Sequence, residues 1–192
     1  MKTLIVIPVR MASKRFPNKP MALIKGKPMV QRVWEQAISS ALGDVVVACC
    51  EKEVFNLIKS LGGDATMTPP ELPSGTDRVF AVIKNHPEGR QFDSIINLQG
   101  DMPTISPNTI NSILDYKQLV NSDIYTLATK INNSEEKHDP NVVKVVISKA
   151  YKKSFGKALY FSSLLILPPF SVSSPVSTKM IYYSAKCIKV TW

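Results

Sequence analysis

Short apolar runs alternate with amphipathic stretches along most of the chain. The apolar runs are rich in β-branched residues, which is typical of strands that are covered on both faces of a parallel sheet. We predict strands at Leu4–Val9, Val45–Cys49, Ser94–Gln99, Tyr125–Ile131 and Val142–Ile147. Because helical stretches separate the first three, we expect an α/β fold with a mainly parallel or mixed central sheet and helices on both faces.

Three stretches have the spacing of helices: Met29–Ala41, Glu53–Leu61, and Pro107 to about Tyr116. The first should bury one apolar stripe, which we assign to Val30, Val33, Trp34, Ala37 and Ile38. The pair Gly62–Gly63 is expected to end the second helix. Ser106 is the expected N-cap of the third, with Pro107 in its first turn.

The character of the chain changes after about residue 163. Residues 163–192 contain no acidic residue, have few helix signals and show no clear period. We therefore predict a domain at residues 1–162 and a divergent tail at residues 163–192, which a frameshift or a degenerate replacement would explain.

The net charge of +9 raises the possibility of nucleic-acid binding, so the location of the charge matters. Residues 140–192 hold eight lysines and no acid, whereas the preceding part is nearly neutral. Scattered lysines without interleaved arginines and stacking aromatics are a poor signature for nucleic acids. We expect no nucleic-acid partner.

The three cysteines, Cys49, Cys50 and Cys187, have no metal-binding spacing, and this usage fits a reducing compartment. The apolar run at the N-terminus is too short for a signal peptide or a membrane span. We expect a cytoplasmic protein without a membrane partner.

A cationic loop, RMASKRFPNKP at residues 10–20, follows the first predicted strand. Its four cations can offset the charge of about −4 on a triphosphate, with Ser13 and backbone N–H groups as neutral donors. Its two prolines lower the entropy lost when the loop closes on a ligand. The alternative is a solvated basic surface loop. The four cations are Arg10, Lys14, Arg15 and Lys19.

The third predicted strand leads into QGDMP, residues 99–103. A carboxylate such as Asp101 at a strand end suits Mg²⁺, which takes one or two carboxylates and completes its coordination with phosphate and water oxygens. The alternative is an ordinary turn aspartate. Since ligands bind beyond the carboxyl ends of parallel strands, this loop and the cationic loop should lie at one edge of the sheet.

A third segment, PSGTDR at residues 73–78, offers exposed backbone around Gly75, short hydroxyls and the charge of Arg78. These groups can read the edge of a base. The segment also fits the start of a helix capped by Ser74 or Thr76, and both interpretations can hold together.

In this order the segments resemble the CMP-3-deoxy-manno-octulosonate (CMP-Kdo) synthetases, cytidylyltransferases of lipopolysaccharide synthesis. Members look like IPARxxSxRxPxKP, GKPMI, VVVATD, MTxxxxxSGTDR, VNVQGDEP and NPNxVKVV…ALYFSR. The chain has IPVRMASKRFPNKP, GKPMV, VVVACC, MTPPELPSGTDR, INLQGDMP and DPNVVKVV…KALYFS. The resemblance runs from residue 3 to about residue 162.

The resemblance implies a Rossmann-like nucleotidyltransferase fold and a reaction of CTP with Kdo that gives CMP-Kdo and pyrophosphate. By position, the triphosphate would be held by Arg10, Ser13, Arg15 and Lys19. The nucleotide would be contacted by Ser74, Gly75 and Arg78. Gln99 would face the sugar, and Asp101 would hold Mg²⁺. Catalysis would rest on Arg10, Lys19 and Asp101, and the family is typically homodimeric.

The chain departs from the family pattern after Ser162. An arginine expected to meet the sugar carboxylate is replaced by Ser163, and the family's later acceptor and metal elements do not follow. We therefore expect nucleotide binding with poor or absent synthesis. Two alternatives stay open: a related sugar nucleotidyltransferase, such as a CMP-sialate synthetase, and an inactive nucleotide-binding remnant.

Overall fold

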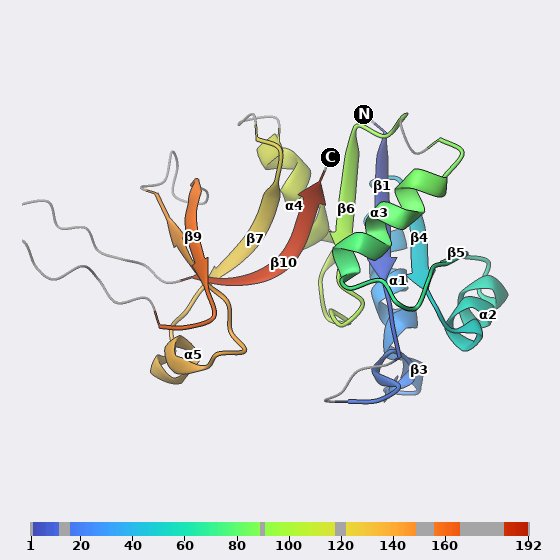
Figure 1. The fold of residues 1–192 in the computed structure, drawn as a ribbon, viewed down its shortest axis with the longest axis horizontal. Helices are drawn as coiled ribbons and strands as arrows, with labels where there is room; N and C mark the ends of the chain where they lie inside the picture. Colours follow the sequence, from blue (N-terminus) through green and yellow to red (C-terminus); the bar gives the residue numbers. More distant parts are fainter. Residues whose placement is uncertain are drawn as a thin grey trace, which may run out of the picture. The chain divides into compact units, whose positions relative to one another are not determined.

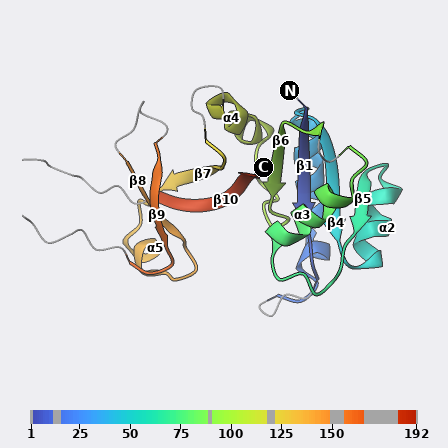
Figure 2. The same ribbon diagram turned by 45° about the horizontal axis from the view of Figure 1, so that its top comes forward.

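The computed structural model describes residues 2–11, 16–88, 91–117, 122–148, 156–165 and 183–191. The chain divides into two compact units, which are described separately (Figures 1 and 2). The first unit comprises Met1–Tyr125 with Ile188–Trp192, and the second comprises Thr126–Cys187. Among the described residues, no helix is both long enough and apolar enough to span a bilayer.

The sheet of the first unit has the strand order β5-β4-β1-β6-β10. Its first four strands are parallel, and β10 pairs antiparallel with β6, with Ile188 opposite Leu98 and Thr191 opposite Ile95. The strands are β1 (Thr3–Pro8), β4 (Asp44–Cys49), β5 (Asp64–Met67), β6 (Ser94–Leu98) and β10 (Tyr183–Thr191). The helices are α1 (Met29–Ser39), α2 (Lys52–Ser60), α3 (Gly75–Asn85) and α4 (Pro107–Lys117).

The core lies on both faces of β1, all six residues of which are buried. Helix α3 covers one face of the sheet, and α1 contacts β1 and β4 on the opposite face, as Figure 1 shows. The core beneath α3 consists of Leu4, Val6, Val46, Ala48, Val79, Val82, Phe92 and Ile95. The structure thus confirms the predicted α/β fold with helices on both faces of a mainly parallel sheet.

The predicted apolar stripe of α1 is wrong at Ile38, which is 49% exposed, and Trp34 is only half-buried. Val30, Val33 and Ala37 are buried as expected. Because these three follow steps of three and four residues, they face the sheet together. Ile38 directly follows Ala37, so it is rotated by about 100° towards solvent.

The predicted ends of two helices are confirmed. Beyond α2 the chain turns at Gly62, whose φ of 78° lies in the left-handed region that favours glycine. The hydroxyl of Ser106 accepts the backbone N–H of Thr109 at 3.1 Å, which caps the start of α4.

The second unit contains β7 (Tyr125–Lys130), α5 (Ser134–His138), β8 (Lys144–Ile147) and β9 (Ala158–Ser162). Strand β8 pairs antiparallel with β9 and, at Val145 and Lys144, with Tyr183 and Ser184 of β10. Strand β7 also pairs with β10. The boundary that we predict after residue 162 stays a prediction, since residues 166–182 lie outside the described part of the chain.

Candidate functional site

One cavity of about 340 Å³ opens at the carboxyl edge of the first unit's sheet. Its walls come from the ends of β1 and β6, the segment around η1 (Lys19–Met21) and the start of α3. All the described residues that we predicted as site residues line it: Arg10, Lys19, Ser74, Gly75, Arg78, Gln99 and Asp101. Ser13 and Arg15, and also Lys14, lie outside the described residues.

A second cavity, of about 410 Å³, lies towards the other end of α3. Phe80 and Ile83 contribute much of its wall, and none of the predicted site residues lines it. The smaller cavity therefore differs from this one, because charged and polar groups from three separate loops line it.

The two ends of the cationic loop are held by hydrogen bonds. The N–H of Asn18 donates to the carbonyl of Met11 at 3.2 Å, which closes the base of the loop. The N–H of Met11 in turn donates to Oε1 of Glu51, the residue before α2, at 2.9 Å. Glu51 is thus a positioning residue that our sequence reasoning missed.

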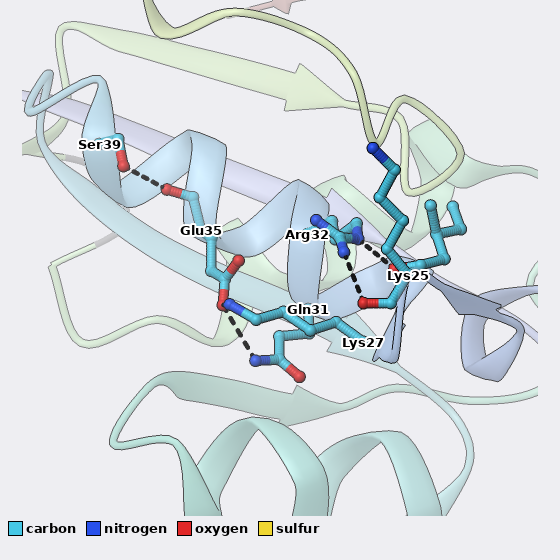
Figure 3. A network of polar contacts seen from close by, with 7 residues as sticks. Lys25, Lys27, Gln31, Arg32, Glu35 and Ser39 are labelled. Carbon is cyan, nitrogen blue, oxygen red and sulfur yellow. Dashed lines mark hydrogen bonds and ion pairs between the residues drawn. The ribbon is translucent and has the colours of Figure 1, made fainter.

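A short hairpin follows the cationic loop and is fixed to α1 (Figure 3). Its strands are β2 (Leu23–Ile24) and β3 (Lys27–Pro28). Arg32 of α1 donates to the carbonyls of Ile24 and Lys25 at 2.6 and 3.1 Å. Glu35 accepts from Lys27 at 2.7 Å and from Gln31 at 2.9 Å.

The hairpin network also determines the charge of Glu35. The hydrogen bond from the Lys27 ammonium holds the pKa of this carboxyl below its ordinary value of 4.5. The hairpin is therefore fastened by a carboxylate that stays ionised at neutral pH.

Lys19 and Asp101 form an ion pair in the wall of the cavity. The ammonium of Lys19 lies 2.8 Å from Oδ2 of Asp101, and the two side chains are 37% and 53% exposed. At this exposure the pair stabilises the fold by about 1 kcal/mol at most. Both groups therefore remain accessible to a ligand that offers stronger partners.

Arg78 is buried, with 2% of its surface exposed, although it lines the cavity. Its Nη1 donates to Oγ1 of Thr68 and to the carbonyl of Pro69, whereas its Nη2 has no hydrogen-bond partner among the described residues. A buried guanidinium with a spare donor is costly without a partner.

The start of α3 presents backbone to the cavity. Ser74 caps this helix: its Oγ accepts the N–H of Asp77 at 3.2 Å and donates to the Asp77 carboxylate at 2.5 Å. A Cβ built on Gly75 would come within 3.3 Å of Pro8 and 3.7 Å of Oε1 of Gln99. The predicted helix start at PSGTDR is therefore confirmed, and the same residues line the cavity, whereas a contact with a base stays a prediction.

Cys49 ends β4 and Cys50 directly follows it, close to Arg78 and Glu51. Burial raises the pKa of the Cys49 thiol to about 12, and burial together with a hydrogen bond to Glu51 raises the pKa of Cys50. Both side chains thus stay protonated near neutral pH and add no charge to the site. No cluster of three or more His, Cys, Asp or Glu side chains that could hold a metal ion occurs among the described residues.

Comparisons with known proteins agree with this geometry. A family model described as cytidylyltransferase matches residues 4–187. The 3-deoxy-manno-octulosonate cytidylyltransferases of Paramagnetospirillum magneticum and Rhodospirillum centenum are 49% and 44% identical over 160 residues. The matches cover 83% of this chain and 65% and 62% of those relatives, so the chain spans less than two thirds of their length.

Two solved structures extend the comparison. A CMP:2-keto-3-deoxy-manno-octonic acid synthetase complexed with CTP gives a TM-score of 0.80 at 34% identity, covering 100% of this chain and 74% of the other. A 4-diphosphocytidyl-2C-methyl-D-erythritol synthase from Anaerococcus prevotii, at 9% identity and a TM-score of 0.57, covers 99% and 71% and shows the likeness of fold alone. The chain belongs to the cytidylyltransferase family and is similar to its 3-deoxy-manno-octulosonate cytidylyltransferases.

Proposed function

We propose that the protein transfers CMP from CTP to Kdo and releases pyrophosphate, as a step in making lipopolysaccharide. One observation carries the proposal: the cations, the carboxylate and the polar helix start that we predicted separately line one cavity. Its volume lies within the range of roughly 300–1,000 Å³ that is usual for small-molecule sites.

The charges divide the cavity into two regions. Arg10 and Lys19 follow β1 and suit the β- and γ-phosphates, whereas Ser74, Gly75 and Arg78 offer uncharged backbone and a buried donor for the nucleoside. In the reaction, the anomeric hydroxyl oxygen of Kdo forms a bond to the α-phosphorus. The bond from that phosphorus to the bridging oxygen breaks, the hydroxyl proton passes to solvent, and pyrophosphate leaves. The two cations stabilise the charge that develops on the pyrophosphate.

Asp101 is the residue that would hold Mg²⁺. Its carboxylate lines the cavity and is half exposed, which fits an ion that takes one protein carboxylate and otherwise phosphate and water oxygens. When bound, the ion would offset negative charge on the triphosphate. Lys19 would then exchange its ion pair with Asp101 for a contact to phosphate.

The cellular setting follows from the substrates. We propose CTP and Kdo as small-molecule partners of a cytoplasmic protein, with the homodimer of the family as its assembly. No nucleic-acid partner is proposed, because Arg10 and Lys19 line one small cavity, which suits a single triphosphate.

The test combines calorimetry with a pyrophosphate-release assay on the full chain. We expect CTP·Mg²⁺ to bind, and pyrophosphate to be released with CTP and Kdo but not with CTP and sialate. The Paramagnetospirillum magneticum relative provides the positive control. CTP binding without release for either sugar would favour the nucleotide-binding remnant, release with sialate alone would favour the related synthetase, and no CTP binding would contradict all three.

A further inference from the structure

Asn97 is an unexpected residue in the middle of β6. All five residues of this strand are buried, and the side chain of Asn97 is 0% exposed among apolar neighbours in sequence. Asparagine is disfavoured in strands, and a buried amide needs partners for both of its ends. Its Nδ2 has no hydrogen-bond partner among the described residues, so the residue weakens the fold where it stands.

The other end of this amide holds a residue of the cavity. Nε2 of Gln99 donates to Oδ1 of Asn97 at 3.0 Å. Asn97 lies on β6 and Gln99 directly follows the strand, two positions later, so their hydrogen bond lies on the face of the sheet that Asn97 occupies. That face also carries Val6, opposite Asn97, and Ile95, both of which belong to the core beneath α3.

This contact engages one end of the Gln99 amide and leaves its other end for the cavity. A free glutamine can present its NH₂ donor or its oxygen acceptor. With Nε2 engaged by Asn97, Oε1 faces Gly75, where a built Cβ would lie 3.7 Å away. Gln99 and Gly75 both line the cavity, so its wall at this point carries a hydrogen-bond acceptor.

We propose that Asn97 is a positioning residue that orients Gln99 so that Oε1 accepts a hydrogen bond from a donor group of the bound ligand. This inference rests on the proposed function, since the ligands there supply two such donors. One is the exocyclic amino group of cytosine, and the other is a hydroxyl group of Kdo. The stability lost by burying an unpartnered amide nitrogen would thereby serve recognition.

Two substitutions at Asn97 separate its roles. Asn97→Leu has nearly the same shape and removes both polar ends, so it should not lower the unfolding midpoint but should weaken ligand binding by about tenfold, the effect of one hydrogen bond. Asn97→Asp keeps an acceptor oxygen towards Gln99, so the affinity of its folded form should stay within about threefold of the unmodified protein, but its unfolding midpoint should fall because a carboxyl group is placed at a fully buried position. Equal losses in both variants, or no loss in Asn97→Leu, would overturn the proposal.

Thr3→Val is the matched control. Thr3 lies on β1, is 2% exposed, and its Oγ1 also has no hydrogen-bond partner among the described residues. Removing this hydroxyl should not lower the unfolding midpoint either, yet it should leave ligand affinity unchanged. A loss of affinity in Thr3→Val equal to that in Asn97→Leu would show a general effect of the core and overturn the proposal.

Calorimetry in the absence of Mg²⁺, with CTP, with UTP, and with Kdo added to CTP-saturated protein, identifies the donor without turnover by the proposed reaction. A loss for CTP but not for UTP would assign it to the cytosine amino group, and a loss for Kdo alone would assign it to a sugar hydroxyl. Either result supports the proposal. Unchanged binding of all three would overturn it.

A double-mutant comparison tests whether Asn97 acts through Gln99. In a Gln99→Leu background, Asn97→Leu should cause no further loss of affinity, and fully additive losses would overturn the inference. These readouts are binding constants and do not require turnover. Absent pyrophosphate release from the unmodified protein would therefore count against the proposed function and not against the orienting role.

Discussion

In the first unit every residue of β1 is buried, whereas in the second unit four of the five residues of β9 are exposed. Of residues 126–148 and 156–165 in the second unit, only Ile131, Lys144 and Val145 are buried. The candidate site lies wholly in the first unit. A packed parallel sheet thus fixes the loops that line the candidate site, while few buried groups are found in those two segments of the second unit. The two units should therefore respond differently to substitution.

The largest effect is expected for the double substitution Arg10→Ala with Lys19→Ala. Each of the two substitutions should remove a charge-assisted hydrogen bond to phosphate that contributes about 1.5–3 kcal/mol. The Kd for CTP should therefore rise by two to four orders of magnitude. Calorimetry measures this. Lys84→Ala, an exposed cation on α3, is the control and should change little. An unaltered Kd in the double variant would remove the phosphate role from the cationic loop.

The corresponding test of the second unit is the substitution Lys144→Met. The buried ammonium donates to the carbonyls of Asp139 at 2.6 Å and Ser163 at 2.7 Å, and methionine keeps the apolar stem but leaves both carbonyls without this donor. We expect the free energy of unfolding to fall by about 2 kcal/mol in urea titrations. Affinity for CTP should stay within about twofold.

Lys157→Met, an exposed lysine in the same unit, is the control for stability. If the Lys144 variant lost CTP affinity as strongly as the cationic-loop variant, the two units would not differ in their response to substitution.

A smaller effect, about tenfold or 1.4 kcal/mol, is expected for Asp101→Asn. The variant should lose the gain in CTP affinity that Mg²⁺ provides. Without Mg²⁺ it should bind CTP at least as well as the unmodified protein, because Lys19 is freed from its ion pair. Titrations with and without Mg²⁺ measure both. Asp115→Asn on α4 is the control, and retained Mg²⁺ dependence in Asp101→Asn would move the metal site elsewhere.

The smallest effect concerns Glu35 and pH. Because its pKa is lowered in the folded state, its contribution to stability is fully present above its ordinary value of 4.5 and is lost as the pH falls through the folded value. The contribution is a few tenths of a kcal/mol for such a solvent-screened pair. Unfolding curves between about pH 3 and 6 should therefore differ in slope between the unmodified protein and Glu35→Gln. Parallel curves would show that the hairpin does not depend on this charge.

Three of the four parallel strands, β1, β4 and β6, could be predicted from the sequence because burial on both faces leaves continuous β-branched runs, as at Val45–Cys49. The sequence also predicted which loops share an edge, because parallel strands end together. Ile38 was misassigned because the sequence does not show whether an apolar residue next to a buried stripe faces the core or the solvent. The short strands β2, β3 and β5 were missed because their few residues carry no period.

Those residues of the candidate site that have an uncommon pattern, such as several cations directly after a strand, could be predicted from the sequence. The residues that hold these side chains and loops in position could not be predicted. Glu51 carries no special signal, and its contact with Met11 joins positions 40 residues apart. Asn97 is a polar interruption of an apolar run, which was a detectable signal, but its partner Gln99 becomes evident only when both lie on one face of the sheet.

The pairing of β10 with β6 has a consequence for biosynthesis. The edge of β6 that faces Ile188–Thr191 is completed by residues made about ninety positions later. A nascent chain thus exposes that strand edge until residue 191 leaves the ribosome, and exposed edges invite association with other strands. Chaperones that shield such edges would matter more for this protein than its size suggests.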